Sequence, residues 1–183
     1  MSRKATNKLL HKAKKSKSDE FYTQLCDIES ELKFYKSHFK DSVIYCNCDD
    51  PKISNFFKYF SVNFEDIGIK KIITSCYKER ADDLFGEKNN DSGFFFEYTN
   101  KDEEKERLNS PEIKPLTGDG DFRSLESIEL LKKPDIVVTN PPFSLFREYV
   151  EQLVKHHKKF LIIGNVNAIT YKEIFELIKD NRA

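Results

Sequence analysis

Four adjacent residues, Asn140 to Phe143, combine groups that suit the binding of an amine. The stretch "DIVVTNPPF" begins as an apolar, β-branched run and stops at two prolines. Because Pro141 and Pro142 have no backbone N–H and restrict the residues before them, the turn is stiff and presents carbonyl oxygens rather than donors. The Asn140 side-chain oxygen adds an acceptor and Phe143 adds a flat apolar face. We therefore expect this turn to bind a planar group that carries an NH₂.

The exocyclic amine of adenine or cytosine fits this description, and so does a primary amide. Asn140 cannot serve as a base, because an amide does not take up a proton at neutral pH. Its expected contribution is to position the amine and to stabilise charge on its nitrogen as a bond forms. The alternative is an ordinary strand-to-helix turn with prolines near the helix start. The position of Asn140 after a buried strand in an α/β pattern favours the functional interpretation.

The elements around this turn follow from hydrophobic periodicity. One helical face is marked by Leu25, Ile28, Leu32, Tyr35 and Phe39. Further helices are expected over 55–64, 124–133, 146–154 and 170–180, the last with Thr170 and Glu173 as a capping box, and strands over 43–48, 70–76, 93–99, 135–139 and 159–165.

The expected strands are short, rich in β-branched residues and separated by helices. This pattern predicts an α/β fold with a mostly parallel sheet covered by helices on both faces. Ligands of such sheets bind at the carboxyl ends of the strands. The residues that follow positions 46, 76, 139 and 163 are therefore the candidates for function.

The bulk composition sets further limits. A length of 183 residues suits one domain, and 31 basic residues balance 31 acidic ones, so net charge does not decide for or against nucleic acid. No apolar run approaches the ~18 residues of a membrane span, and the N-terminus has no secretory signal. Cys46 and Cys48 lack the second pair of a zinc site, which indicates reduced cysteines in a cytoplasmic protein without a bound metal. Residues 1–18 are expected to be a basic, disordered arm of the kind that holds polyanions, with Arg3, Lys4, Lys8, Lys12, Lys14, Lys15 and Lys17.

Asn-Pro-Pro-Phe after an apolar strand resembles the catalytic motif of amino-group methyltransferases that use S-adenosylmethionine. The wider match is carried by "DEFYTQ", "YCNCDDPKISNFF", "GDGDFRS", "DIVVTNPPFSLFREYV" and "KFLIIGNVNAITYKEIF". In that order, these segments resemble the EcoRI-type adenine-specific DNA methyltransferase family over most of residues 19–180. The resemblance implies a Rossmann-like methyltransferase fold and a catalytic domain over 19–183. It also implies a bacterial restriction-modification enzyme that methylates N6 of a flipped-out adenine in double-stranded DNA, and we favour a monomer.

The same resemblance assigns residues to the site. The target adenine would be held by Asn140, Pro141, Pro142 and Phe143. The S-adenosylmethionine contacts would come from the strand ends and the segments beside them, namely Tyr22, Thr23, Asn47, Cys48, Asp49, Asp50, Cys76, Tyr77, Asp121 and Phe122.

The sequence also departs from the methyltransferase pattern. The loop after the first strand, "CNCDDPKIS", has no glycine, and no acidic residue clearly ends the second strand. For Asp49 and Asp50, a turn or helix-cap role explains the sequence as well as a cofactor contact does. Because a target-recognition region follows the last matched motif in this family, we expect a truncated, N-terminal catalytic part. Alternatives are methylation of RNA bases or of protein glutamine amides, or a fragment that binds cofactor or DNA without turnover.

Overall fold

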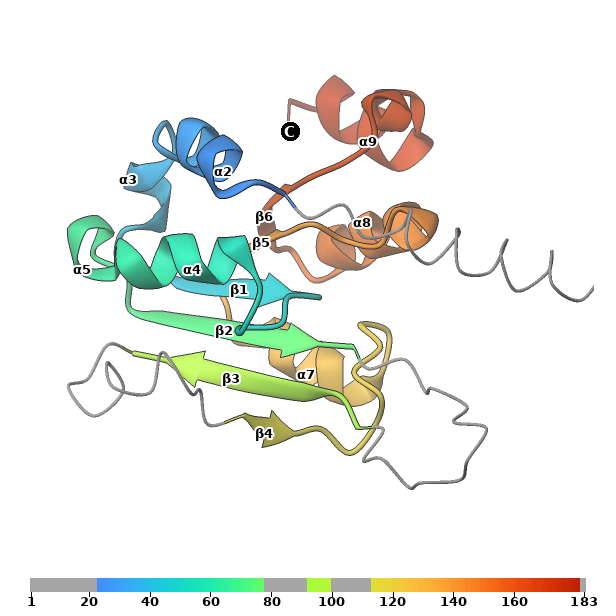
Figure 1. Ribbon diagram of the computed structural model, residues 1–183. Helices are drawn as coiled ribbons and strands as arrows, with labels where there is room; N and C mark the ends of the chain where they lie inside the picture. Colours follow the sequence, from blue (N-terminus) through green and yellow to red (C-terminus); the bar gives the residue numbers. More distant parts are fainter. Residues whose placement is uncertain (1–22, 78–91, 100–112, 182–183) are drawn as a thin grey trace, which may run out of the picture.

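The computed structural model describes residues 23–77, 92–99 and 113–181, and within these residues the fold is organised by one six-stranded sheet (Figure 1). The strand order is β4-β3-β2-β1-β5-β6. The strands are β1 (Val43–Asn47), β2 (Lys71–Cys76), β3 (Phe94–Tyr98), β4 (Lys114–Pro115), β5 (Ile136–Thr139) and β6 (Lys159–Ile162).

Four neighbouring strands run parallel, namely β2, β1, β5 and β6. The remaining two, β3 and β4, pair antiparallel at one side of the sheet. Asn47 lies beside Ser75 in the register of β1 and β2, so both strands end at the same edge of the sheet. Because β5 is parallel to β1, Thr139 and Asn140 reach that edge as well. The mostly parallel α/β sheet expected from the sequence is confirmed.

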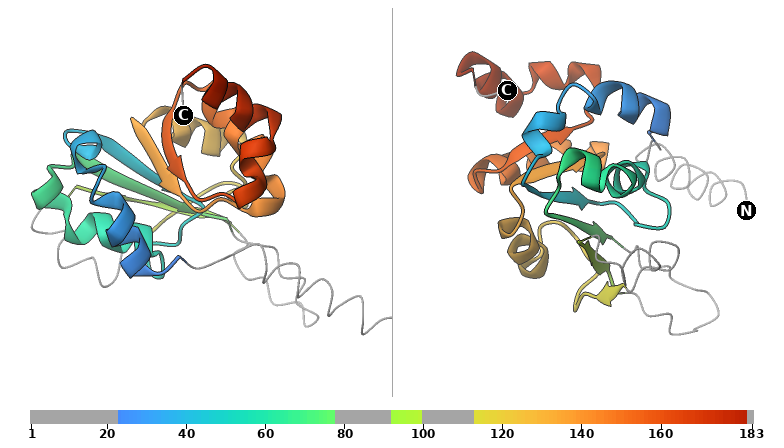
Figure 2. Two further views of the ribbon diagram at one scale, coloured as in Figure 1. Left: turned by 90° about the horizontal axis from the view of Figure 1, so that it is seen from above. Right: turned by 90° about the vertical axis from the view of Figure 1, so that its left-hand side faces the viewer.

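Helices cover both faces of the sheet (Figure 2). One face packs against the phenylalanine-rich helix α4 and its neighbours, and the other packs against α7 and α8. The helices are α2 (Leu25–Leu32), α3 (Lys36–Phe39), α4 (Asn55–Val62), α5 (Phe64–Ile67), α7 (Leu125–Lys132), α8 (Phe146–Lys155) and α9 (Lys172–Lys179), with 3₁₀ turns η2 (Phe143–Leu145) and η3 (Val166–Thr170).

The first expected helical face is divided between two helices. The N–H groups of Phe34 and Tyr35 bond to carbonyls three residues earlier, which tightens and ends α2 before α3 begins. Leu32 and Phe39 are still both buried, and Phe39 packs edge-on against Phe60 with ring centroids 5.1 Å apart. The apolar spacing thus identified the buried face correctly, although the backbone does not form one continuous helix.

The prediction of a capping box at the start of α9 is wrong. Thr170 ends η3 and donates its hydroxyl to the carbonyl of Asn167, and Tyr171 occupies the N-cap position without a side-chain cap bond. The carboxylate of Glu173 accepts two hydrogen bonds from Arg147 on α8, at 3.0 and 2.9 Å. A charge-assisted pair between helices therefore replaces the local cap.

The loop between β4 and α7 closes against the end of β2 through Gly120. Gly120 has a φ of +85°, and a Cβ atom there would lie 2.6 Å from the carbonyl oxygen of Cys76. Only glycine combines this backbone conformation with so close an approach. The close approach places residues 119–122 beside the functional edge of the sheet.

We expect Gly120→Ala to lower the free energy of unfolding by about 1–3 kcal/mol, because alanine disfavours a positive φ and its methyl group would meet the Cys76 carbonyl. Chemical denaturation measures this change. Gly118→Ala is the matched control, since a Cβ at Gly118 meets no described atom within 4 Å. Equal stabilities of the two variants would contradict the assigned role of Gly120.

Candidate active site

The Asn-Pro-Pro-Phe turn lies at the carboxyl end of β5, as the sequence predicts. The last residue of β5 is fully buried, Pro141 is buried, and Asn140 is partly buried with its Oδ1 atom inside the protein. The carbonyl of Pro142 accepts from the Leu145 N–H at 3.0 Å as η2 begins. Thus the Pro142 carbonyl is used within the turn, whereas the Pro141 carbonyl has no hydrogen-bond donor among the described residues.

A cavity opens beside Asn140 and joins the ends of β1, β2 and β5. Its walls come from α4, from the turn after β1 and from Thr23, two residues before α2. The lining residues are Thr23, Cys48, Asp49, Asp50, Ile53, Ser54, Asn55, Phe56, Cys76 and Asn140. Among the residues expected to bind a cofactor, the cavity brings together Thr23, Cys48, Asp49, Asp50 and Cys76. No lysine, arginine or histidine lines it in the described part of the chain.

The chain turns sharply where β1 ends. Cys48 has a φ of +65°, in the left-handed region, and Asn47 supports this conformation from beneath. The Asn47 Oδ1 atom accepts from the Cys48 N–H and from the Ser75 hydroxyl, each at 2.9 Å. Asn47 is 3% exposed, so its side chain shapes the loop instead of lining the cavity. The turn after β1, which lacks the glycines of the methyltransferase pattern, is thus supported by the Asn47 side chain.

Asp49 and Asp50 have different environments. Asp50 accepts from the Lys52 N–H at 2.9 Å through its carboxylate, which makes it a turn residue that also lines the cavity. Asp49 accepts at 2.7 Å from the Ser54 hydroxyl and at 2.7 Å from the Thr139 hydroxyl. Ser54 also caps α4, because its Oγ accepts from the Phe57 N–H. Asp49 therefore ties together β1, α4 and β5.

Burial raises the pKa of the Asp49 carboxyl from its ordinary value of 3.8 to about 6, although the hydrogen bonds from Ser54 and Thr139 act in the opposite direction. The low polarity around Asp49 disfavours the ionised form, and no cation from the described residues lines the cavity to offset this effect. A positively charged ligand in the cavity would stabilise the carboxylate. The site is thus electrostatically suited to a cationic group.

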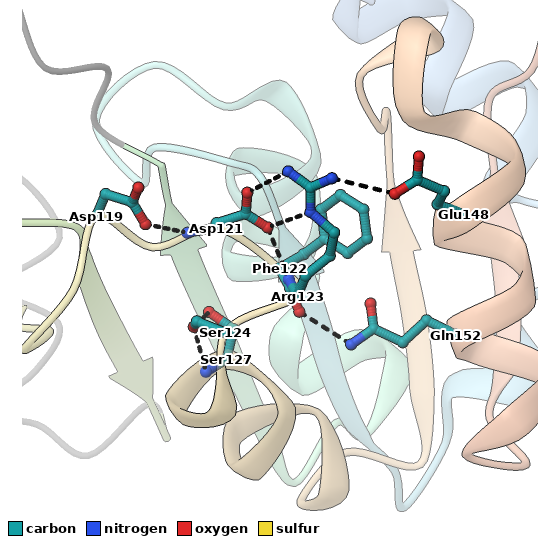
Figure 3. A network of polar contacts seen from close by, with 8 residues as sticks. All are labelled: Asp119, Asp121, Phe122, Arg123, Ser124, Ser127, Glu148 and Gln152. Carbon is teal, nitrogen blue, oxygen red and sulfur yellow. Dashed lines mark hydrogen bonds and ion pairs between the residues drawn. The ribbon is translucent and has the colours of Figure 1, made fainter.

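The other expected cofactor residues that the structure describes do not line this cavity. Tyr77 is 46% exposed, and Tyr22 lies outside the described residues. Asp121 pairs with Arg123 at 2.7 Å, and Arg123 pairs in turn with Glu148 on α8 at 3.1 Å (Figure 3). This arginine lowers the pKa of the Asp121 carboxyl.

Phe122, beside this ion pair, belongs to the core. Its ring is 4% exposed and meets Tyr149 edge-on at 5.1 Å, and its carbonyl accepts from Gln152 at 2.9 Å (Figure 3). In this structure the loop around Asp121 and Phe122 is held against α8 rather than directed into the cavity. A ligand contact from either residue remains a prediction.

Three residues of the site were missed by the sequence reasoning. Ser54 had a recognisable signal, since a serine directly before an apolar helical run is a typical N-cap. Ser75 and Thr139 had none, because inside strands they resemble ordinary small or β-branched residues. Their hydroxyl groups acquire a role only when β1, β2 and β5 are aligned.

A metal-binding cluster and a membrane-spanning helix are both absent from the described residues. Residues 23–77, 92–99 and 113–181 contain no group of three or more His, Cys, Asp or Glu side chains that could hold a metal ion. None of the helices in these ranges has the length and apolar character needed to span a bilayer.

Comparison with known proteins decides the family. A family model described as the adenine-specific methyltransferase EcoRI matches residues 9–183. The chain belongs to this family. No solved structure matches the chain.

The curated relatives that match the chain are much longer than the matched region. The Type II methyltransferase M.EcoRI of Escherichia coli is 63% identical over 182 residues, which cover 100% of this chain and 56% of the relative. The Type II methyltransferases M.MgeORF184P of Mycoplasma genitalium and M.MpnI of Mycoplasma pneumoniae are each 39% identical over 94% of this chain, covering 49% and 48% of the relatives. The chain thus spans about half the length of the curated relatives it matches.

The raised pKa of Asp49 makes the stability of the ligand-free protein depend on pH. A carboxyl whose pKa is higher in the folded state stabilises the fold most below its ordinary pKa, and this contribution is lost as the pH rises through about 6. Asp49→Asn removes the ionisation, so we expect it to raise the free energy of unfolding by about 2–3 kcal/mol near pH 8, at ~1.4 kcal/mol per pKa unit. The gain should vanish near pH ~4.

Denaturation at a series of pH values measures this difference. Glu151→Gln, which neutralises an exposed carboxylate on α8, is the control for a general charge effect. A pH-independent difference between Asp49→Asn and the wild type would contradict the buried, ionisable environment assigned to Asp49.

Proposed function

We propose that the chain carries the cofactor-binding and amine-positioning region of a site-specific DNA adenine N6-methyltransferase that uses S-adenosylmethionine. The family membership supports methyl transfer to adenine. The observation that carries the proposal is one cavity that joins Asn140 to the acidic end of β1. Both halves of a transfer reaction, a methyl donor and an amine, would meet there. Residues 19–183 would then form the catalytic domain of a bacterial restriction-modification enzyme.

The charge of the cavity supports this cofactor. S-adenosylmethionine would supply an electrophilic methyl group on a positively charged sulfonium. Asp49 and Asp50 line the cavity without a basic side chain from the described residues, so the cavity complements a ligand of net positive charge. The cavity volume of about 150 Å³ suits the methionine end better than the whole nucleoside. Thr23, Cys48 and Cys76 would complete these contacts, with Tyr22, Asn47, Tyr77, Asp121 and Phe122 as the remaining candidates.

The amine of adenine is a poor nucleophile because its lone pair is delocalised into the ring. The Asn140 Oδ1 atom and the Pro141 carbonyl would accept its two hydrogens and favour a more tetrahedral nitrogen. The prolines supply stiffness, so the two acceptors need little rearrangement during the reaction. The proton leaves the nitrogen after transfer, to water. Asn140 thereby positions and polarises without taking up a proton.

Flipping the adenine out of the duplex costs a few kcal/mol. Phe143 lies two residues after Pro141 and is half-buried, and it lines a second cavity with Arg147 and Tyr171. Stacking of the base on Phe143 would return about 1–3 kcal/mol. Double-stranded DNA is thus the proposed substrate.

We expect Asn140→Ala to lower methyl transfer by the full-length gene product at least about a hundredfold, the scale of losing one charge-stabilising group. Binding of S-adenosylmethionine should change far less, because the cofactor would be held mainly by the ends of β1 and β2. Tritium transfer to duplex oligonucleotides and calorimetry measure the two effects. Asn63→Ala, at the C-terminal end of α4 and not among the cavity-lining residues, is the matched control.

Duplex DNA, RNA and protein substrates are compared in the same assay. Transfer to RNA or to glutamine amides but not to DNA would contradict the proposal that adenine in DNA is the substrate. Full transfer by Asn140→Ala would refute the assignment of Asn140. Cofactor binding without transfer to any substrate would indicate a binding module.

A further inference from the structure

Thr139, the residue directly before Asn140, is fully buried at the end of β5. Its hydroxyl lies within hydrogen-bond distance of the Asn47 backbone carbonyl on β1 and 2.7 Å from the Asp49 Oδ2 atom. These contacts join residues 92 and 90 positions apart in the chain. Thr139 therefore connects the proposed amine site to the proposed cofactor site from beneath.

The hydroxyl of Thr139 has one hydrogen and two acceptors close to it. When Asp49 is ionised, that hydrogen can satisfy either the carboxylate or the Asn47 carbonyl, but not both. When Asp49 is protonated, it donates to the Thr139 Oγ1, and Thr139 in turn donates to Asn47. The protonation state of Asp49 therefore determines whether one or both of the hydrogen bonds at the Thr139 hydroxyl, which join β1 to β5, can form.

The backbone of Thr139 is fixed as well. Its carbonyl accepts from the Ile163 N–H at 3.2 Å, on the side of β6. Between the fixed Thr139 and the rigid Pro141, the Asn140 backbone has only two soft dihedral angles, and the following proline narrows both. A displacement of Thr139 would therefore be transmitted directly to the two acceptors.

We propose that Thr139 is a positioning residue for methyl transfer: its hydroxyl, bridged to Asn47 and Asp49, holds the Asn140 and Pro141 acceptors in place beside the cavity. This role rests on the function proposed above. It differs from the role of Asn140, because Thr139 acts through its neighbours and does not touch the substrate.

The surroundings of Asp49 make the bridge responsive near pH 6. Burial raises the pKa of Asp49 to about 6, and its bond from Thr139 acts to lower that pKa. Facing Asp49 are Cys46 on β1 and Tyr149 on α8, and burial raises the pKa of both groups well above their ordinary values, so both are neutral near pH 6. The other titratable side chains lining the cavity in the described part are Cys48, Asp50 and Cys76.

The chain offers a matched pair of buried threonines for the test. Thr74, on the neighbouring strand β2, is also fully buried, but its hydroxyl finds no hydrogen-bond partner among the described residues. Thr139→Val and Thr74→Val remove the same group from fully buried strand positions, and only the first removes a bridge. Thr139→Ser restores the hydroxyl without the methyl group.

We expect Thr139→Val to lower the kcat of the full-length gene product about ten- to a hundredfold, the scale of a misplaced reacting group. The Kd for S-adenosylmethionine should stay within a few-fold of the wild type. Thr139→Ser and Thr74→Val should keep kcat within a few-fold. A carbon-13 NMR titration of the carboxyl groups should show the pKa of Asp49 raised in Thr139→Val and unchanged in Thr74→Val.

Wild-type kcat in Thr139→Val, or an equal loss in Thr74→Val, would overturn the proposal. If Thr139→Val fails to fold, Thr139→Cys takes its place, because a thiol is only a weak donor; kcat should then lie below that of Thr139→Ser, and equal values would overturn the proposal. A wild-type protein without methyl transfer would refute the proposed function instead. An unshifted pKa of Asp49 in Thr139→Val would refute the bridge independently of activity.

Discussion

The alignment of β1, β2 and β5 at one edge of the sheet determines where every candidate group lies. These strands come from distant parts of the chain, and only their parallel pairing brings Asp49, Cys76 and Asn140 to one cavity. The pairing is supported by a buried apolar core on each face of the sheet. The hydroxyls of Ser75 and Thr139 then join neighbouring strand ends directly. The site is therefore a property of the sheet edge more than of any single loop.

Asp49 lowers the stability of the ligand-free protein but favours the binding of a positively charged ligand in the cavity. An ionised Asp49 destabilises the folded protein, since burial disfavours its charge and the described lining offers no cation. An uncharged side chain would relieve that cost but would also remove the attraction for a positively charged ligand. A residue that weakens the empty protein is expected where the energy is recovered on binding. The Ser54 and Thr139 hydroxyls reduce this cost without neutralising the carboxylate.

The sequence was sufficient for the sheet and for the position of Asn140. Short β-branched runs between helical stretches indicated the parallel arrangement, and the two prolines marked the end of β5. It was not sufficient for the capping of α9, because Glu173 pairs with Arg147 across helices and no local pattern records that partner. It could not reveal Thr139 either, since its role depends on the alignment of β5 with β1. Local signals predicted elements, whereas contacts between distant elements had to be observed.

The Arg123 pairs and the Phe122 contacts hold the same loop against α8 by different means. Arg123 is half exposed, so its pairs with Asp121 and Glu148 weaken as ionic strength rises. The Phe122 ring against Tyr149 is buried, and screening by ions barely affects such apolar packing. At high salt the loop should therefore stay packed against α8 through Phe122, while the ion pairs of Arg123 weaken. The loop beside the end of β2 would thus keep its place at ionic strengths that weaken contacts between exposed charges.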